Sequence, residues 1–303
     1  AHVVSRAAGC AAVSTTLSVG NRPVGHTATG LGPEMVARAG WGRGQPRAGY
    51  HPGDGDVAAA GPEGGLTMCG RFVSTTPADQ LAAYFGVDQL GESLLEPSYN
   101  VAPTNQVYTV YEREDERRLV TARWGLIPFW AKDAKIGNRM INARSETVAT
   151  KNAFRKALRR QRCIVPADSF YEWVKLPGHQ NKTPFRIHRV DEAPFAMAGL
   201  WDTWKDEDGE RILSCTILTG PANEKVAKIH DRMPVILPPA AWDEWLDPHL
   251  DDVERLEELF VPAPPELVDV HPVSTEVNNP RNRGEQLIAP IEVEALETEE
   301  PTS

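Results

Sequence analysis

Cys69 is the residue whose neighbours most directly suggest covalent chemistry. It stands in the segment Met68-Cys69-Gly70-Arg71-Phe72, so removal of Met68 would make it an N-terminal residue. An N-terminal cysteine carries an α-amine with a pKa of about 7.7–8.0 and a thiol with a pKa of about 8.5, and both are partly reactive near neutral pH. With an aldehyde, the amine forms an imine and the thiol then closes on the imine carbon, which gives a thiazolidine. The alternative is a buried structural cysteine, because the nitrogen of a cysteine inside the chain is an amide.

Two other residues have side chains that can exchange protons. Glu172 lies between Tyr171 and Trp173, and we expect partial desolvation there to raise its pKa toward the working range of a general acid or base. His230 can give and take a proton near neutral pH. The alternatives are a surface glutamate on a strand and a histidine stabilised at the end of a helix.

These residues lie in segments that resemble the SRAP family (SOS response-associated peptidase), the abasic-site processing proteins. The resemblance rests on short matches that keep the family's order over about residues 68–290. The matching segments are Met68–Phe72, Tyr99–Pro103, Trp124–Trp130, Ile141–Thr147, Ser169–Trp173, Leu218–Thr219, Ile229–Pro234 and His271–Ser274.

The resemblance implies a function in DNA damage and repair, within the SOS response. N-terminal Cys69 would form a covalent thiazolidine crosslink with abasic sites in single-stranded DNA and so shield them. Asn142 would hold the amine and the sugar by hydrogen bonds, since an amide offers both donor and acceptor. Glu172 would transfer protons, and His230 would assist sugar ring opening, imine formation and reversal. Weak lyase activity and autopeptidase (hydrolase) activity are also implied.

The resemblance further implies a set of DNA-binding residues. The guanidinium groups of Arg71, Arg144 and Arg232 suit phosphate oxygens, and the Thr219 hydroxyl would lie near the sugar or the backbone. Pro103 and Trp130 would pack against bases beside the lesion, where stacking on an aromatic contributes about 1–3 kcal/mol per base. The alternatives are ordinary ion pairs for the arginines, a plain strand threonine, and core packing for Trp130. We assign Trp124, Trp173 and Trp201 to the core.

Composition limits the function classes. Hydrophobic residues make up 41% of the 303 residues, and the four cysteines form no C-x-x-C pair. We therefore expect no zinc module, no redox motif and no disulfide scaffold. Such sparse use of cysteine is typical of a protein that resides in a reducing cytosol. We expect no cofactor and no metal, since a phosphate-binding glycine loop is also absent. No apolar run reaches the length of a membrane span. We expect a cytoplasmic monomer, nucleoid-associated if bacterial.

Charge is less decisive. The net charge of −10 argues mildly against a nucleic-acid partner, although the distribution of charge matters more than its total. The stretch Lys151–Arg162 carries six basic residues and no acid. It could attract a phosphate backbone, but we favour a solvated helix face.

Three regions are expected along the chain. Residues 1–67, which hold 14 of the 24 glycines, should be a disordered extension or a mis-assigned start. Residues 68–290 should form the SRAP domain, and residues 291–303 an acidic flexible tail. In family members the cysteine directly follows the initiator methionine, so we expect the active form to begin at Cys69.

The patterning predicts an α+β fold around an antiparallel or mixed sheet, and the resemblance implies a barrel-like core with short peripheral helices. Predicted helices are Pro77–Phe85, Ser145–Arg160, Asn223–His230, Ala240–Leu246 and Asp252–Phe260. Predicted strands are Val107–Val110, Leu119–Trp124, Cys163–Val165, Pro184–Val190, Phe195–Trp201 and Ile212–Thr219.

Two rival functions remain. The first is a thiol peptidase with Cys69 as nucleophile and His230 as base, including a self-processing form. The second is a non-covalent module that binds single-stranded DNA, in which Cys69 is only structural.

Overall fold

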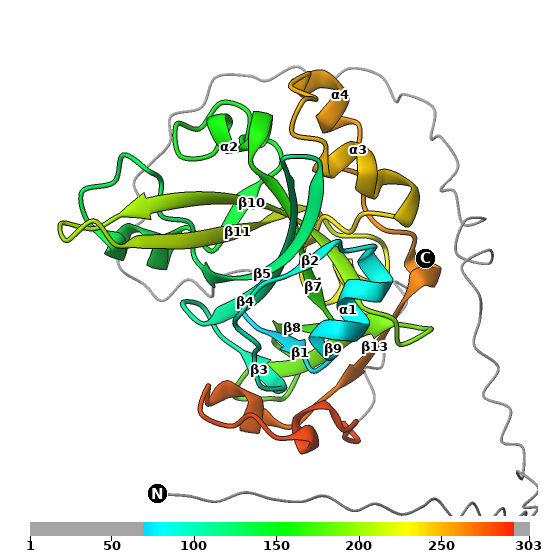
Figure 1. Ribbon diagram of the computed structural model, residues 1–303. Coiled ribbons are helices and arrows are strands. Elements are labelled where there is room, and N and C mark those ends of the chain that lie inside the picture. Colours follow the sequence, from blue (N-terminus) through cyan, green and yellow to red (C-terminus); the bar gives the residue numbers. More distant parts are fainter. Residues whose placement is uncertain (1–68, 294–303) are drawn as a thin grey trace, which may run out of the picture. The chain divides into compact units, whose positions relative to one another are not determined.

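A closed barrel of five strands forms the centre of the fold (Figure 1). The computed structural model describes residues 69–293, so the expected extension 1–67 and most of the tail 291–303 lie outside the described residues. The barrel order is β11-β10-β7-β4-β5, and a parallel pairing of β5 with β11 closes the ring. Closure leaves none of these strands with a free edge. The bounds are β4 Gln106–Arg113, β5 Glu116–Trp124, β7 Arg162–Ala167, β10 Phe195–Lys205 and β11 Arg211–Pro221.

Three short strands extend the barrel sheet. β2 (Gln89–Leu90) runs parallel to β5. β6 (Asn142–Arg144) runs parallel to β11, and β12 (Arg232–Pro234) runs antiparallel to it. Strand β11 is therefore flanked by β6 and β12, which contain the predicted site residues Asn142, Arg144 and Arg232.

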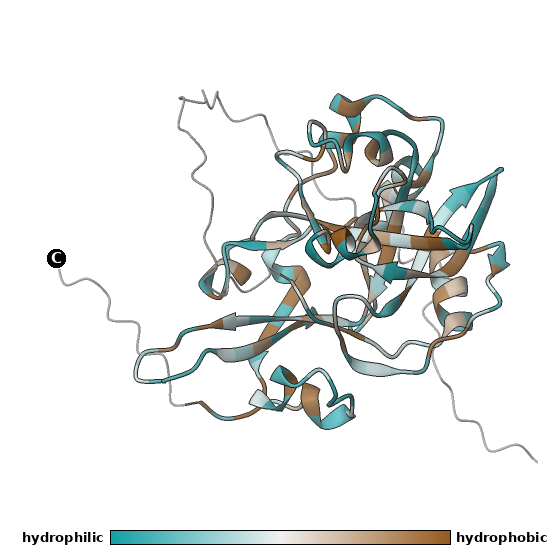
Figure 2. Cartoon of the chain, turned by 90° about the vertical axis from the view of Figure 1, so that its left-hand side faces the viewer, coloured by the Kyte–Doolittle hydropathy of each residue, from teal (hydrophilic) through white to brown (hydrophobic). Residues whose placement is uncertain are grey.

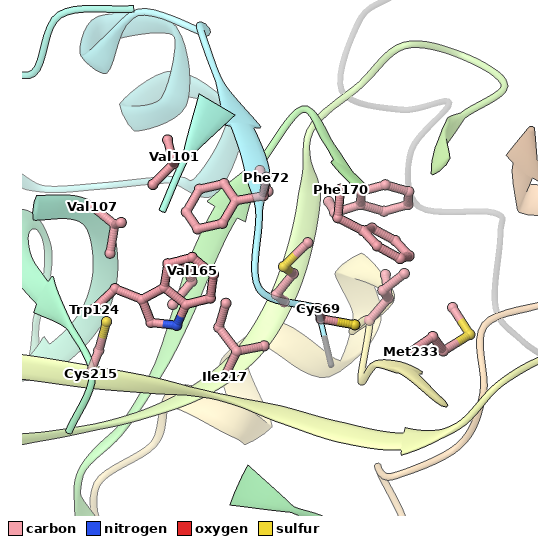
Figure 3. Close-up of a cluster of buried hydrophobic side chains, with 14 of the residues drawn as sticks. Cys69, Phe72, Val101, Val107, Trp124, Val165, Phe170, Cys215, Ile217 and Met233 are labelled. Atoms are coloured by element: carbon pink, nitrogen blue, oxygen red, sulfur yellow. The ribbon is translucent and has the colours of Figure 1, made fainter. Parts of the chain in front are cut away.

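A second sheet of five strands packs against the barrel. Its order is β13-β9-β8-β1-β3, and all its pairings are antiparallel. Side chains of both sheets share one buried cluster, which includes Phe72, Phe170, Trp124, Val165 and Cys215 (Figure 3). The bounds are β1 Phe72–Ser74, β3 Ser98–Val101, β8 Ser169–Val174, β9 Thr183–Arg189 and β13 Val268–Pro272.

The helices are short and lie outside the sheets. They are α1 Ala78–Phe85, α2 Arg155–Arg160, α3 Trp242–Leu246 and α4 Val253–Glu257. The 3₁₀ turns are η2 Ala134–Arg139, η3 Val226–Lys228, η4 Pro239–Ala241, η5 Pro265–Leu267, η6 Thr275–Asn278 and η7 Glu285–Ile288. Hydrophobic and hydrophilic segments alternate along both the helices and the strands (Figure 2). No helix in residues 69–293 is long and apolar enough to cross a membrane.

The predicted α+β class with a barrel-like core is confirmed, and several elements match closely. Helix α1 ends at Gly86, which adopts a φ of 64° as a C-cap; glycine takes this conformation without steric cost. The charged turn between β4 and β5 places Glu114 and Asp115 at positive φ, as a tight hairpin turn requires. All six predicted strands are present, as parts of β4, β5, β7, β9, β10 and β11, and only the predicted Val190 lies beyond its strand.

The predicted helix Ser145–Arg160 is wrong over most of its length, since only Arg155–Arg160 is helical. The amide of Ser145 donates to the carbonyl of Thr219 at 2.9 Å, so the chain is still bonded to β11 where the helix was expected to begin. Residues 146–154 then form successive turns. Pairing with the barrel thus overrides local helix propensity.

The predicted helices after β11 are also shorter than expected. Asn223–His230 contains only the 3₁₀ turn η3, and Asp252–Phe260 contains only α4. Ala240–Leu246 divides into η4 and α3. Each shortened element contributes buried side chains to the core, which indicates that tertiary packing rather than propensity stabilises them.

Candidate active site

Cys69 lies at the point where the chain enters β1. The antiparallel register of β1 and β8 pairs Phe72 with Phe170, and its continuation brings Gly70 opposite Glu172. The backbone nitrogen of Cys69 donates a hydrogen bond to Glu172 Oε1 at 2.6 Å. Both residues are only 3% exposed. Sheet pairing therefore joins two residues that are 103 positions apart in the chain.

The Cys69 thiol belongs to the same buried cluster as Phe170 and Met233 (Figure 3). Its pKa is raised well above the ordinary value, first by burial and then by the charge and hydrogen bond of Glu172. The charge of Arg232 opposes this effect. The thiol is consequently protonated at neutral pH, unlike the low-pKa thiolates of reactive cysteines.

Glu172 is a buried carboxyl with a raised pKa. Burial is the largest cause, while the Cys69 hydrogen bond and the charge of His230 act in the opposite direction. The direction agrees with the expectation for a carboxyl between two aromatic residues. A carboxyl whose pKa is raised in this way can supply and accept protons closer to neutral pH.

His230 follows η3, and its backbone nitrogen donates to the Val226 carbonyl at 3.0 Å. Its Nδ1 accepts the backbone N–H of Arg232 at 3.1 Å and lies 3.0 Å from Asp231 Oδ1. The first contact needs an unprotonated Nδ1, whereas the second needs a protonated one. The Asp231 side chain is 87% exposed, so its pull is weak. Of the two tautomers of the ring, the backbone contact therefore favours the one with its proton on Nε2.

Arg232 is held by two sets of oxygens. Its Nη2 donates to the Thr219 carbonyl at 2.6 Å and lies 3.5 Å from the Thr219 hydroxyl. Its Nη1 and Nη2 donate to the two carboxylate oxygens of Glu146 at 2.6 and 2.9 Å. Thr219 and Arg232 thus form one unit beside the Cys69 thiol, whose pKa the Arg232 charge lowers.

Asn142 and Arg144 share strand β6. The register with β11 places Asn142 opposite Ile217 and Arg144 opposite Thr219. Asn142 is half-buried, whereas Arg144 is exposed. Two of the predicted site residues therefore lie beside the strand that also carries Thr219.

An open cleft of ≈ 570 Å³ adjoins the cysteine. Its lining includes Gly70, Arg71, Pro103 and Trp173, so two of the predicted DNA-binding residues meet there. Trp173, which we expected in the core, is partly buried against the cluster that contains Val73 and Tyr171. It also lines this cleft, and its Nε1 donates to Asn278 Oδ1 at 2.7 Å. Trp124 is fully buried, as expected, and the partly buried Trp201 packs on Tyr111.

Arg71 is held by Asn100, a residue for which we predicted no role. Its Nη1 donates to Asn100 Oδ1 at 2.8 Å and to the Val277 carbonyl at 2.9 Å. Asn100 is fully buried and donates in turn to the carbonyls of Val277, Asn279 and Asn282. The signal was present in the sequence as a lone amide within the apolar segment Tyr99–Pro103. Burial of Arg71 lowers its pKa.

Trp130 is not joined to the Cys69–Glu172 pair by any contact described within residues 69–293. Trp130 is 47% exposed, which argues against the core-packing alternative. It lies beside Phe129, whose ring carries Lys156 Nζ at 3.9 Å from its centre. Two exposed aromatic residues in sequence, with a cation above the Phe129 ring, are a suitable surface for stacking bases.

The basic stretch Lys151–Arg162 divides into two parts. Arg155, Lys156, Arg159 and Arg160 are exposed on α2, in agreement with a solvated face. Arg162 is buried and donates to the carbonyls of Leu158, Arg159, Trp245 and Asp247. It is therefore a structural residue that caps the ends of α2 and α3.

The fold and this site define a known class of protein. The sequence model of the family SOS response associated peptidase (SRAP) matches residues 68–280, and the chain belongs to this family. The match begins one residue before Cys69 and includes β1, β8 and the His230 loop.

Named relatives come from bacteria and animals. The chain is 45% identical over 222 residues to the abasic site processing protein YoqW of Bacillus subtilis, covering 73% of this chain and 99% of that protein. It is 34% identical to the abasic site processing protein YedK of Escherichia coli, covering 74% and 100%. It is also 34% identical to the abasic site processing protein HMCES of Gallus gallus, covering 75% and 79%.

A solved structure shares the fold. A crystal structure of a protein from Bacteroides thetaiotaomicron matches with a TM-score of 0.66 and 28% identity, covering 74% of this chain and 100% of that one.

Proposed function

We propose that the chain forms a covalent thiazolidine crosslink with abasic sites in single-stranded DNA, through Cys69 as a free N-terminal residue, and thereby shields these sites. The observation that carries the proposal is the 2.6 Å hydrogen bond from the Cys69 nitrogen to Glu172 Oε1. It places the atom that would become the nucleophilic amine against a buried carboxyl. The names of the relatives YoqW, YedK and HMCES support abasic DNA as the substrate.

The order of bond formation follows from the ionisation of the two nucleophiles. Because burial raises the pKa of the thiol, the amine attacks first. Glu172 takes a proton from the amine, which then adds to the aldehyde carbon of the open-chain sugar. The resulting hydroxyl leaves as water with a proton returned by Glu172, and an imine remains. The thiol sulfur then bonds to the imine carbon, and the thiol proton passes to the nitrogen.

His230 has a separate role in this scheme. Its backbone contact leaves a proton on Nε2, which suits donation to the sugar ring oxygen during ring opening. The same ring can return the proton when the adduct reverses. Proton loss from the sugar carbon next to the imine would give weak lyase activity. Asn142 on β6 would orient the amine and the sugar.

DNA binding would use the residues around the cleft. Arg71, Arg144 and Arg232 would contact phosphates, and Thr219 would support Arg232 through its carbonyl. Pro103, which lines the cleft, and the exposed Trp130 would pack against bases beside the lesion.

The condition for this chemistry is a free amine at Cys69. Two observations support an active form that begins there. The family match starts at residue 68, and Cys69 has a φ of 43°, a conformation that costs a non-glycine residue roughly 1–2 kcal/mol. Loss of the Met68–Cys69 bond removes this dihedral and its strain. Self-cleavage at that bond would be the autopeptidase activity that the resemblance implies.

A general thiol peptidase fits the site less well. Such an enzyme needs a stabilised thiolate, whereas the group in contact with Cys69 is a carboxyl that raises the thiol pKa. A purely non-covalent binder would not need the buried carboxyl at the Cys69 nitrogen.

The test compares Cys69→Ala with the unmodified protein, both prepared to begin at residue 69, on an abasic single-stranded oligonucleotide. We expect a product that survives denaturation for the unmodified protein and none for Cys69→Ala, while non-covalent binding persists in both. An oligonucleotide with a tetrahydrofuran site, which has no aldehyde, is the matched substrate control. Equal covalent yields from both proteins would overturn the proposal.

A further inference from the structure

Glu146 is a carboxylate placed where a DNA phosphate is expected to bind. It accepts two parallel hydrogen bonds from Arg232, at 2.6 and 2.9 Å. A guanidinium binds carboxylate and phosphate oxygens with the same two-pronged geometry. The carboxylate therefore occupies the donors through which Arg232 would grip the backbone.

The two partners differ in exposure. The Arg232 side chain is 12% exposed, whereas the Glu146 side chain is 48% exposed. Arg232 is also fixed by its bond to the Thr219 carbonyl, so it stays in place when its partner leaves. Glu146 lies in the turns after β6, outside any helix or strand. Of the two, Glu146 is the one that can move away.

Charge favours a tight pair in the free protein. Arg232 lowers the pKa of Glu146 chiefly through the hydrogen bond, and the charge of Arg144 adds to this effect. A single carboxylate therefore faces two of the arginines proposed to bind phosphates. It offsets their attraction for any polyanion, whether or not the polyanion contains an abasic site.

We propose that Glu146 is a specificity-determining residue that acts as an internal substitute for phosphate on Arg232. Intact single-stranded DNA must displace Glu146 to reach the guanidinium, and it gains no covalent bond in return. Abasic DNA displaces Glu146 as well, but the covalent bond to Cys69 then holds the abasic DNA on the protein. The inference rests on the proposed function, since it assumes that Arg232 binds DNA.

Glu146→Gln tests the proposal, because it removes the charge and keeps the shape. We expect binding of undamaged single-stranded DNA to tighten about fivefold, since a half-exposed ion pair is worth roughly that factor. The same DNA should compete about fivefold better against crosslinking of an abasic oligonucleotide. The salt dependence should also steepen, by up to about 0.7 in log affinity per log salt, as one more phosphate is engaged.

Glu116→Gln is the matched control. Glu116 is a partly exposed carboxylate that accepts a hydrogen bond from Arg118 at 2.7 Å, at the β4–β5 turn. The substitution Glu116→Gln removes the same unit of charge. It should leave both the affinity for single-stranded DNA and its salt dependence nearly unchanged. In an Arg232→Gln background, Glu146→Gln should lose its effect, because Glu146 acts through Arg232.

The opposite outcomes are distinct. Weaker binding by Glu146→Gln, or an unchanged salt dependence, would overturn the proposal and make Glu146 a mere support for Arg232. If the unmodified protein crosslinks abasic DNA in the same assay, such a result affects this inference alone. If the unmodified protein neither binds nor crosslinks abasic DNA, the proposed function itself fails.

Discussion

At the scale of single residues, the site depends on one contact between a backbone nitrogen and a buried carboxyl. The Cys69 nitrogen and Glu172 Oε1 lie 2.6 Å apart, and burial raises the pKa of both the Cys69 thiol and the Glu172 carboxyl. Burial therefore keeps both groups closer to their neutral forms than they would be in water. This is the state required of a carboxyl that must return a proton to a leaving hydroxyl.

The raised pKa of Glu172 predicts a pH-dependent stability. A carboxyl whose folded pKa lies above its ordinary value of 4.5 contributes stability at low pH that is lost as pH rises through the folded pKa. Glu172→Gln cannot ionise. We therefore expect the melting temperature of Glu172→Gln to rise relative to that of the unmodified protein, by a few degrees, as the pH increases above the ordinary carboxyl pKa.

The measurement is thermal unfolding at several pH values. Glu116→Gln, in the exposed hairpin, serves as the control for loss of one carboxyl. A difference between Glu172→Gln and the unmodified protein that stays constant across these pH values would show that Glu172 ionises as an ordinary surface carboxyl does.

At the scale of elements, the sequence predicted those parts of the fold that local chemistry decides. Gly86 ends α1, and a charged turn joins β4 to β5, as expected. The strands nearest the chemistry, β1, β6, β8 and β12, were not predicted. Three of them have only three residues, too few for a periodic pattern, and β8 is buried along Ser169–Glu172 without alternation.

The site residues were easier to predict than the elements that hold them. The short matching segments predicted Cys69, Glu172 and His230 as site residues. Only the pairing of β1 with β8 brings Cys69 and Glu172 together. Glu146 and Asn100 lay within the matching segments, yet their roles depend on Arg232 and Arg71, which lie far from them in the sequence. Partners of this kind follow from tertiary contacts and not from local spacing.

Arg162 carries a prediction for the helices. It is 3% exposed and caps α2 and α3 through four carbonyls. Arg162→Met leaves these carbonyls without donors, and each unsatisfied buried group costs about 1–3 kcal/mol. We expect a loss of at least about 3 kcal/mol in the free energy of unfolding, measured by urea denaturation.

Arg160→Met is the matched control on the same helix. Arg160 is exposed and pairs with Asp251 at 3.1 Å, so its replacement should cost no more than about 1 kcal/mol. Similar losses for the two variants would show that the carbonyl contacts of Arg162 add little to stability.

At the scale of the whole molecule, the barrel and the second sheet hold the site between them. Glu172 comes from the second sheet, whereas Asn142, Thr219 and Arg232 come from strands of the barrel sheet. Cys69 precedes β1 and is buried in the cluster that both sheets share. The packing of the two sheets thus positions the residues proposed for chemistry, and the proposed reaction requires in addition a free amine at Cys69.

The central claim is that both the nitrogen and the sulfur of Cys69 bond to the abasic sugar. The direct measurement is the intact mass of the product formed on an abasic oligonucleotide. Two proteins are compared: one begins at Cys69, and the other retains Met68 because cleavage of the Met68–Cys69 bond is blocked. We predict an adduct equal to protein plus DNA minus one water, with no free thiol at Cys69, from the first protein only. An equal yield from the protein that keeps Met68 would contradict the account.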